Sequence, residues 1–367
     1  MQKRLTLVVG SGLIACLAII TLSLTKVEAA TCQVPEPARP AKFVVNVPAP
    51  TNTNPVDIAK VVNGDSATRA TVFQLAANAT YRVNALIVLK AGDELRGAVG
   101  TKPQVPGSVA TDPNPTTKLE NGAALESLIA LRGDNAITWL DIQGADYKGQ
   151  SGGGSAIAAG SGDDDTWIQY NRIHDNGAAG ITNARGHILD NEIDHNTTEP
   201  AALGHIGAGV KGIMEYEAGC NWVHDNLGHG LWGDVLMEDT SVGSFNVHDN
   251  VLSNNGRAGV RHERNECSPQ GAEFIAVGNV IKDNGWESVR GGVSIHDACD
   301  DPRSYVANNT FSGNKDNLAV RITDSGRSDR PDTKNVTVEN NTMNGQIVKL
   351  GSGVSAQADN IRVLNNK

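Results

Sequence analysis

One hexapeptide, Asn-x-apolar-x-x-Asn, recurs through the second half of the chain and strongly limits what the chain can fold into. The starting positions of successive copies lie 20, 30, 29, 29, 30 and 32 residues apart. A repeat of this length indicates a solenoid in which each repeat forms one coil. The copies begin at Asn171, Asn191, Asn221, Asn250, Asn279, Asn309 and Asn341, and the seventh ends in Gln346 instead of Asn.

Short apolar segments flank each copy. An alternating segment such as 245–247 precedes it, and a Gly with a second short segment such as 259–260 follows it. Because two or three short strands cannot bury their own apolar face, each unit must stack on the next. Stacking brings equivalent residues to roughly 4.8 Å from one another, so equivalent Asn side chains can form a hydrogen-bonded ladder. Thirteen of the 25 Asn after residue 170 occupy these positions, which makes the Asn surplus structural.

The first part of the chain continues the pattern less regularly. Short runs rich in apolar and β-branched residues predict further strands there. These runs are 71–75, 85–89, 128–131 and 137–142. Segments 98–120 and 145–163 are rich in Gly, Pro and Ser and are expected to be protruding loops. Asn54 followed by Pro55 is a helix start signal, so residues 56–62 are expected to form a short helix that caps the first coil.

The N-terminus has the composition of a secretory signal. Lys3 and Arg4 precede an apolar run at 5–24, and residues 27–29 place small or apolar residues at the −3 and −1 positions of a cleavage site. We therefore expect residues 1–29 to be a signal peptide, and the mature protein to be secreted, periplasmic or extracellular, with no membrane segment. An uncleaved anchor is the alternative, since the run is just long enough to span a bilayer.

The charge of the mature chain excludes one class of partner. Removing residues 1–29 leaves 28 basic and 40 acidic residues, which is a net charge of −12. A surface of this charge does not attract nucleic acid by bulk electrostatics. We therefore expect no nucleic-acid partner.

The repeat resembles that of right-handed parallel β-helix proteins, the architecture of pectate lyases, polygalacturonases and many secreted bacterial repeat proteins. The resemblance implies an all-β chain that forms a single right-handed parallel β-helix over residues 70–367, preceded by an N-terminal segment and cap at 30–69. Residues 230–234 and 259–263 are also similar to a Gly-x-Trp-x-Asp then Gly-x-x-x-Glu pairing in secreted β-helix proteins. The catalytic motifs of pectate lyases and polygalacturonases are not recognisable, so the resemblance predicts fold more specifically than activity.

Aligning the coils on the Gly that opens the second strand predicts a stripe of outward side chains. The residue after each Gly should point inward, so the residues two and four after it should point outward. This stripe gathers the densest set of catalytic residue types in the chain. It contains Lys211, Trp232, Arg261 and Ser294, with Asp234, Glu263 and His296 beside them.

Asp234 and Glu263 occupy equivalent places on adjacent coils, so we expect their carboxylates to lie on the order of 5 Å apart. Like charges at this distance raise one pKa, which provides an acid and a base, and the spacing is that of a retaining glycosidase. Alternatively, the two carboxylates hold Ca²⁺ while Arg261 or Lys211 acts as the base of a lyase on a uronate. A solvated face of alternating charge is the non-functional alternative.

Other residues of the stripe are expected to bind substrate. Trp232 offers a flat apolar surface on which a sugar ring can stack. His296 lies one coil beyond Glu263 and is expected to join the site, whereas His262 should point inward and be structural. Local positive charge near Glu263 would hold an anionic glycan despite the net charge of the chain. The residues that supply it are Arg257, Arg261, Arg264 and Arg290.

Four cysteines remain after export, which permits oxidation. Cys267 and Cys299 should stand at nearly the same place on neighbouring coils, so we predict a disulfide between them. This disulfide would hold the loop that follows Glu263. Cys220 directly precedes Asn221 and is expected to be buried.

Two functions are consistent with these features. The first is a secreted enzyme that acts on a polysaccharide as a lyase or glycoside hydrolase, with Asp234, Glu263, Arg261 and Lys211 as its catalytic residues. The second is a non-catalytic β-helix that binds glycan or serves as a cell-surface scaffold.

Overall fold

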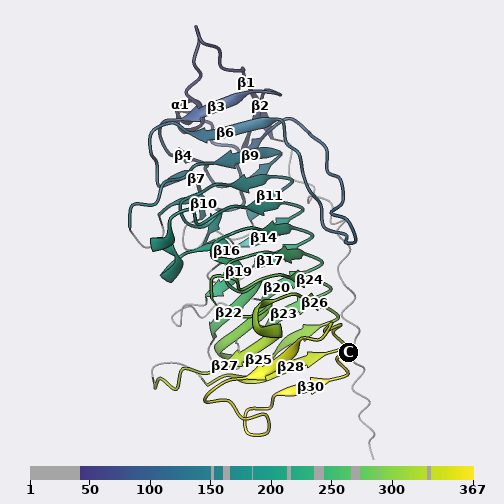
Figure 1. Cartoon of the computed structure of the whole chain (residues 1–367). Helices are drawn as coiled ribbons and strands as arrows, with labels where there is room; N and C mark the ends of the chain where they lie inside the picture. Colours follow the sequence, from purple (N-terminus) through teal and green to yellow (C-terminus); the bar gives the residue numbers. More distant parts are fainter. Residues whose placement is uncertain are drawn as a thin grey trace, which may run out of the picture.

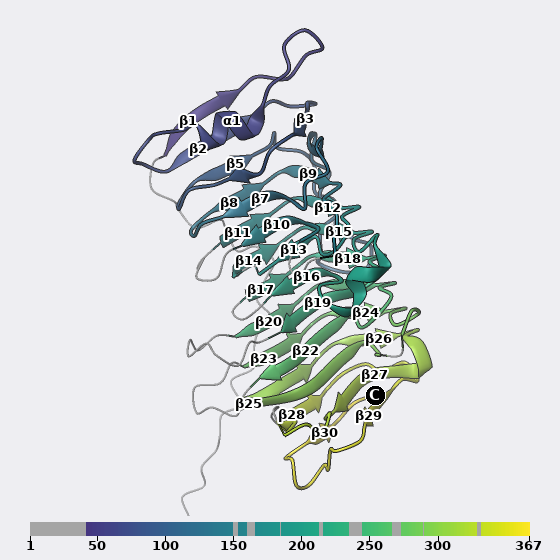
Figure 2. The same ribbon diagram turned by 90° about the vertical axis from the view of Figure 1, so that its left-hand side faces the viewer.

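The computed structural model describes residues 42–149, 153–159, 166–183, 185–212, 216–234, 244–265, 273–288, 290–328 and 332–367. Within them the chain winds into stacked coils whose strands all run parallel to their neighbours in the next coil (Figures 1 and 2). The chain is a single right-handed parallel β-helix, as its repeat predicts. No helix in the described ranges is long and apolar enough to cross a membrane, and the apolar run at 5–24 lies outside them.

Three parallel sheets, A, B and C, form the walls of the β-helix. Sheet B contains β3 (Thr80–Val83), β6 (Thr117–Asn121), β9 (Leu140–Gln143), β12 (Arg172–His174), β15 (Glu192–Asp194), β18 (Trp222–His224), β21 (Val251–Ser253), β24 (Val280–Lys282) and β26 (Thr310–Ser312). Sheet C contains β4 (Ile87–Val88), β7 (Ser127–Leu131), β10 (Ser155–Ala159), β13 (Ile181–Thr182), β16 (Ala208–Gly212), β19 (His229–Asp234), β22 (Val260–Asn265), β27 (Leu318–Thr323) and β29 (Ile347–Leu350).

Sheet A closes the third side of each coil. It contains β1 (Phe43–Val47), β2 (Thr71–Leu75), β5 (Glu94–Arg96), β8 (Ala136–Thr138), β11 (Thr166–Gln169), β14 (Gly186–Leu189), β17 (Tyr216–Gly219), β20 (Phe245–His248), β23 (Phe274–Val277), β28 (Lys334–Glu339) and β30 (Arg362–Leu364). The long strand β25 (Val293–Ala307) pairs in sheet C through its first half and in sheet A through its second half.

Stacked apolar columns fill the interior. In sheet C the residue directly after each repeat Gly points inward, and Val320, which follows Ala319, continues this column, whose members are all fully buried. They are Val210, Leu231, Val260, Val293 and Val320. Because side chains alternate along a strand, the neighbouring residues on each of these strands must face away from the core. The core therefore sets which residues can form an outer site.

The repeated asparagines form two ladders rather than one, and they flank sheet B on either side. In both ladders the side-chain oxygen of one Asn accepts from the backbone N–H of the Asn one coil earlier, as Asn279 Oδ1 accepts from Asn250 N at 3.0 Å. Between Asn176 and Asn196 the donor is the side-chain amide of Asn176. The first ladder runs through Asn171, Asn191, Asn221, Asn250, Asn279, Asn309, Asn341 and Asn366. The second runs through Asn176, Asn196, Asn226, Asn255, Asn284 and Asn314.

A short helix packs on the first coil, as expected. It is α1 (Ile58–Asn63), and its buried residues Ile58, Ala59 and Val62 cover the end of the core. The predicted N-cap Asn54 is wrong, because Asp57 accepts the hydrogen bond from the backbone N–H of Lys60 at 3.0 Å. An Asp just before the first helical residue is a strong capping signal in its own right.

Three details of the first part of the chain differ from the prediction. The run 137–142 is not one strand, because Trp139 adopts a positive φ of 58° and turns the chain from β8 into β9. β6 lies at the end of the segment expected to be a loop at 98–120, and β10 lies within 145–163. Both strands extend a sheet already formed by earlier coils, so pairing outweighed their weak local strand signals.

The segment 98–116 folds back along the outside of sheet B, and we call it the strap. In Figure 1 it is the long loop that descends from the level of β6. The backbone N–H of Thr111 donates to the carbonyl of Cys220 at 3.0 Å. Val105 and Ala110 pack against Val251 of β21. The strap therefore covers part of the outer face of sheet B and leaves sheet C uncovered by this segment.

Candidate functional site

The structure confirms the register of the predicted stripe on sheet C. The column Lys211, Trp232, Arg261, Ser294 and Arg321 is formed by directly paired residues of β16, β19, β22, β25 and β27. A second column beside it pairs Asp234 with Glu263, His296 and Thr323. Asp234 and Glu263 therefore stand opposite one another on adjacent strands, as the spacing of the repeat predicts.

Each of the two carboxylates has its own cation. Lys211 Nζ lies 2.9 Å from Asp234 Oδ2 and also donates to the carbonyl of His205 at 2.7 Å. Arg261 Nη2 donates to Glu263 Oε2, and Trp232 Nε1 donates to the other oxygen of Glu263 at 3.2 Å. Asp234, Arg261 and Glu263 are all buried. Pairing is what makes burying such charges tolerable, and it also fixes their orientation.

This arrangement does not fit a Ca²⁺ site. Ca²⁺ takes six to eight oxygen ligands. Here both oxygens of Glu263 are held by Arg261 and Trp232, and Oδ2 of Asp234 is held by Lys211, which leaves an ion-paired cluster rather than an acidic one. The expectation that the two carboxylates hold Ca²⁺ is therefore not supported by the geometry.

Trp232 is placed differently from the expectation. Its side chain is only 3% exposed. Lys211 Nζ lies 4.1 Å from the centroid of the ring, and Arg261 Cζ lies 4.9 Å from it. Cation–π contacts with both neighbours orient these cations toward the carboxylates. In this arrangement Trp232 positions Lys211, Arg261 and Glu263 and does not offer an open face for a sugar ring.

His229 is a member of the site that the alignment of coils missed, because it precedes the aligned Gly230. It is fully buried, and its Nε2 lies 3.2 Å from Arg261 Nη1. Burial, with the positive charges of Arg261 and Arg290, holds the pKa of His229 well below its ordinary value. His229 is therefore neutral near pH 7 and packs against Arg261 without adding charge. A His directly before the repeat Gly was the only sequence signal.

The remaining predicted residues extend the site toward β27. His296 Nδ1 lies 2.8 Å from Thr323 Oγ1. Burial lowers the pKa of His296. The nearby Asp297 opposes this change, whereas Arg261 and Arg290 lower the pKa further. Arg290 and His296 are both partly exposed, unlike Asp234 and Glu263. Arg264 lies in β22, but its side chain is outside the described part of the structure.

His262 is structural, as predicted. Its side chain is fully buried on the core side of β22 and stacks on Phe274 with ring centroids 4.7 Å apart. Cys220 is buried as expected, and both Cys220 and Cys299 are disulfide-bonded. Cys267 lies outside the described residues, so the Cys267–Cys299 pairing stays a prediction.

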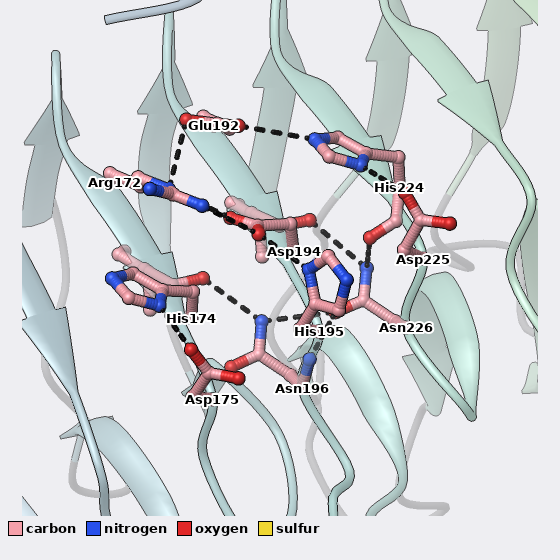
Figure 3. A network of polar contacts seen from close by, with 12 residues as sticks. Arg172, His174, Asp175, Glu192, Asp194, His195, Asn196, His224, Asp225 and Asn226 are labelled. Atoms are coloured by element: carbon pink, nitrogen blue, oxygen red, sulfur yellow. Dashed lines mark hydrogen bonds and ion pairs between the residues drawn. The ribbon is translucent and has the colours of Figure 1, made fainter. Parts of the chain in front are cut away.

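A second polar cluster lies on the outer face of sheet B, and the sequence did not predict it (Figure 3). Glu192 and Asp194 of β15 face His224 of β18, and Arg172 of β12 lies between the two carboxylates. Arg172 Nε lies 3.1 Å from Glu192 Oε2, and Arg172 Nη2 lies 3.0 Å from Asp194 Oδ2. His224 Nε2 lies 3.2 Å from Glu192 Oε1. These contacts form one connected network.

One group of potential metal ligands is found in the described part of the chain. It consists of Glu192, Asp194 and His224. One ligand atom from each lies within 4.8 Å of the others, and all three residues are buried. Arg172 already supplies a positive charge to both carboxylates, however. A divalent cation would have to displace this guanidinium. The cluster therefore fits a structural ion-pair network better than a metal site.

His–Asp pairs at the turns after sheet B strands and after β20 recur for a structural reason. The Asp of each pair adopts a positive φ, and its carboxylate bonds the preceding His. The second nitrogen of each His contacts a carboxylate on an earlier coil, as His248 Nε2 contacts Glu217 Oε1 at 2.8 Å. Burial opposes the charged form of His248, but hydrogen bonds to Asp249 and Glu217 outweigh it and raise its pKa to about 9.

Stability should therefore depend on pH through this pair. Hydrogen bonds from His187 and His248 lower the pKa of Glu217 from 4.5 to about 2. The raised pKa of His248 stabilises the fold fully below 6.5, and this contribution is lost as pH rises through about 9. The lowered pKa of Glu217 stabilises the fold above 4.5, and this contribution is lost only as pH falls through about 2.

We expect urea unfolding to show this dependence when wild type is compared with His248→Gln. The difference in unfolding free energy between the two proteins should be larger at pH 6 than at pH 9. A difference of the same size at both values would show that His248 is not charged in the folded state.

The known proteins that are similar to this chain are similar in structure only. No protein-family model matches the chain, and no curated protein matches its sequence. The A-module of the mannuronan C-5 epimerase AlgE6 from Azotobacter vinelandii is 14% identical, with 85% of this chain and 96% of that chain covered and a TM-score of 0.40. A family 28 exopolygalacturonase from Yersinia enterocolitica is 12% identical, with 89% and 78% covered and a TM-score of 0.36.

The surface adhesin PfbA of Streptococcus pneumoniae is also similar, at 14% identity, with 81% of each chain covered and a TM-score of 0.33. Two of these three proteins are named as enzymes and the third as an adhesin. At such identities and TM-scores, their names carry no inference about the activity of this chain.

Proposed function

We propose that this protein is a secreted enzyme that cleaves a polysaccharide at the sheet C stripe. The observation that carries the proposal is the double ion pair of Lys211 with Asp234 and of Arg261 with Glu263 on adjacent strands. Two carboxylates and two cations fixed beside one another on one face of a sheet supply the acid, base and electrophilic groups of a candidate reaction centre.

The site supplies the groups that cleavage of a glycosidic bond requires. Asp234 and Glu263 are two fixed carboxylates on one face, and Lys211 and Arg261 are two fixed cations that can stabilise negative charge in a transition state. Trp232 and His229 hold Arg261 in place, so the charges need little rearrangement during a reaction. Two chemistries use such groups, hydrolysis with a carboxylate pair and elimination with a base and a neutralising cation.

The second candidate function is a glycan-binding scaffold without turnover. The burial of Asp234 and Glu263 favours it, because a substrate can reach these carboxylates only if side chains or segments around them move. The partly exposed residues Lys211, Arg290 and His296 would suffice for binding alone. The two functions differ in whether a product forms.

A product assay on a polysaccharide panel distinguishes these functions. Purified mature protein is incubated with neutral and acidic polysaccharides, and both absorbance near 235 nm and new reducing ends are followed. We expect at least one polymer to be cleaved, and cleavage to be unchanged by a chelator because the site does not fit Ca²⁺. Unsaturated product identifies a lyase, and reducing ends alone identify a hydrolase. Binding without any product would establish the scaffold instead.

A further inference from the structure

Two polar groups on the stripe have no partner among the described residues. Ser294 is 1% exposed, and its Oγ makes no hydrogen bond. Arg261 is 9% exposed, and its Nε makes none either, although its other nitrogens contact Glu263 and His229. Leaving a buried polar group without a hydrogen bond is unfavourable, so two of them on neighbouring strands call for an explanation. A ligand that accepts hydrogen bonds from both would provide one.

Ser294 lies at the centre of a group of arginines. The paired registers place it between Arg261 of β22 and Arg321 of β27 on the same face of sheet C. Arg290 precedes the same strand, is partly buried, and makes no ion pair or hydrogen bond with the described residues. Ser294 and Arg290 are thus a buried hydroxyl and a partly exposed guanidinium whose hydrogen-bonding capacity is not used by the described residues.

Several arginines of this region are close enough to affect one another's pKa. Burial lowers the pKa of Arg290 to about 10, and Arg261, Arg257 and Arg321 add to this effect. Burial also lowers the pKa of Arg261, even though Glu263 opposes the change. Nearby like charges disfavour the charged form of each arginine, in addition to the larger effect of burial. An anion bound among them would relieve this repulsion.

We propose that Ser294, Arg290 and Arg261 form a subsite for the carboxylate or sulfate group of an acidic polysaccharide. This inference rests on the proposed function and adds the class of substrate and the residues that select it. Arg290 supplies a paired guanidinium contact to the oxyanion, and Ser294 donates its hydroxyl. Ser294 lies one coil beyond Arg261 and Glu263. Of the three subsite residues, Arg290 is partly exposed while Ser294 and Arg261 are buried, so the oxyanion would reach Arg290 first and the other two after side chains above them move. The subsite would therefore hold the sugar next to the one that faces the double ion pair.

Calorimetric titration of the mature protein tests this subsite without requiring turnover. The probes are polygalacturonate, dextran sulfate and unmodified dextran. We expect at least one of the two acidic polymers to bind and dextran not to bind. The acidic polymer that binds more tightly shows whether the subsite prefers a carboxylate or a sulfate group. Arg290→Gln should weaken acidic binding by about 10- to 100-fold, as loss of a charge-assisted hydrogen bond does. Ser294→Ala should weaken it by about 3- to 10-fold.

Arg303→Gln is the matched control. Arg303 lies on the same strand β25 and its guanidinium packs over the ring of Tyr305 at 4.7 Å, but it belongs to the sheet A half of the strand. The substitution Arg303→Gln removes the same charge as Arg290→Gln but leaves the subsite residues unchanged. Arg290→Lys retains charge and should recover part of the affinity, which separates loss of binding from loss of folding.

Equal effects of Arg290→Gln and Arg303→Gln would overturn the subsite, and so would binding of dextran as tight as that of the acidic polymers. Cleavage of a neutral polymer in the product assay would leave the proposed function standing while refuting the subsite. Binding of the acidic polymers that depends on Arg290, with no cleavage of any polymer, would support the subsite and refute the proposed enzymatic function.

Discussion

Replacing Asp234 by Asn or Glu263 by Gln is expected to lower the kcat of polysaccharide cleavage by at least about 10²-fold, the lower end of what positioned acid–base groups contribute. Both substitutions keep the shape of the side chain and remove its charge. Lys211 and Arg261 would lose the carboxylates that orient them. Initial rates on the polymer identified by the product assay measure the effect. Because the residues act as a unit, the double variant should be little worse than either single variant.

Glu94→Gln is the control for these two variants. Glu94 is 2% exposed, as Glu263 is, and it pairs with Arg96 two residues later on β5, as Glu263 pairs with Arg261 on β22. Its loss should change stability to a similar extent and leave kcat unchanged. Circular dichroism should show the same spectrum for all three variants. If kcat of Asp234→Asn and Glu263→Gln equals that of Glu94→Gln, the stripe is not the reaction centre.

Arg172→Gln is expected to lower the unfolding free energy by about 3 kcal/mol, the lower end of the range for breaking a buried ion pair. Arg172 is the cation that contacts both Glu192 and Asp194, and these two carboxylates are buried. The side chain of Arg172 is 38% exposed, so solvent screens part of the loss. Urea unfolding monitored by circular dichroism measures the change. Lys282→Gln, an exposed cation on β24 of the same sheet, should change stability by less than about 0.5 kcal/mol.

The same variant tests the structural interpretation of the sheet B cluster. If Arg172 occupies the place of a cation, Zn²⁺ or Mn²⁺ should not raise the Tm of the wild type. Arg172→Gln leaves Glu192, Asp194 and His224 without the guanidinium, so the same ions should raise its Tm. A rise in the Tm of the wild type at low metal concentration would instead make this cluster a metal site.

The repeat in the sequence was sufficient to predict the fold and the register of the site. Each Asn hexapeptide marks one coil, and each Gly before an inward Val or Leu marks the start of a sheet C strand, so counting from it places Asp234 opposite Glu263. The prediction worked because stacked coils must keep their apolar columns aligned. The same count could not show that Trp232 would be covered by Lys211 and Arg261, since that depends on side-chain conformation.

Two features needed the structure because they depend on contacts between distant segments. The sheet B cluster brings together Arg172, Glu192 and His224, which occupy variable positions of the Asn hexapeptides of three successive coils, so the repeat does not specify their side chains. The strap comes from residues 98–116 and reaches the turn at Cys220, a contact that no local pattern encodes. His229 was missed because the coils were aligned on the Gly that follows it.

Hydrogen–deuterium exchange with and without a bound oligosaccharide tests most directly whether the stripe is the glycan site. The oligosaccharide is taken from the polymer that the product assay or the titration identifies. We expect slower exchange in β19, β22 and the first half of β25, with no change in β15, β18 or the strap. Slower exchange confined to the strap and sheet B, with β19 and β22 unaffected, would contradict this expectation.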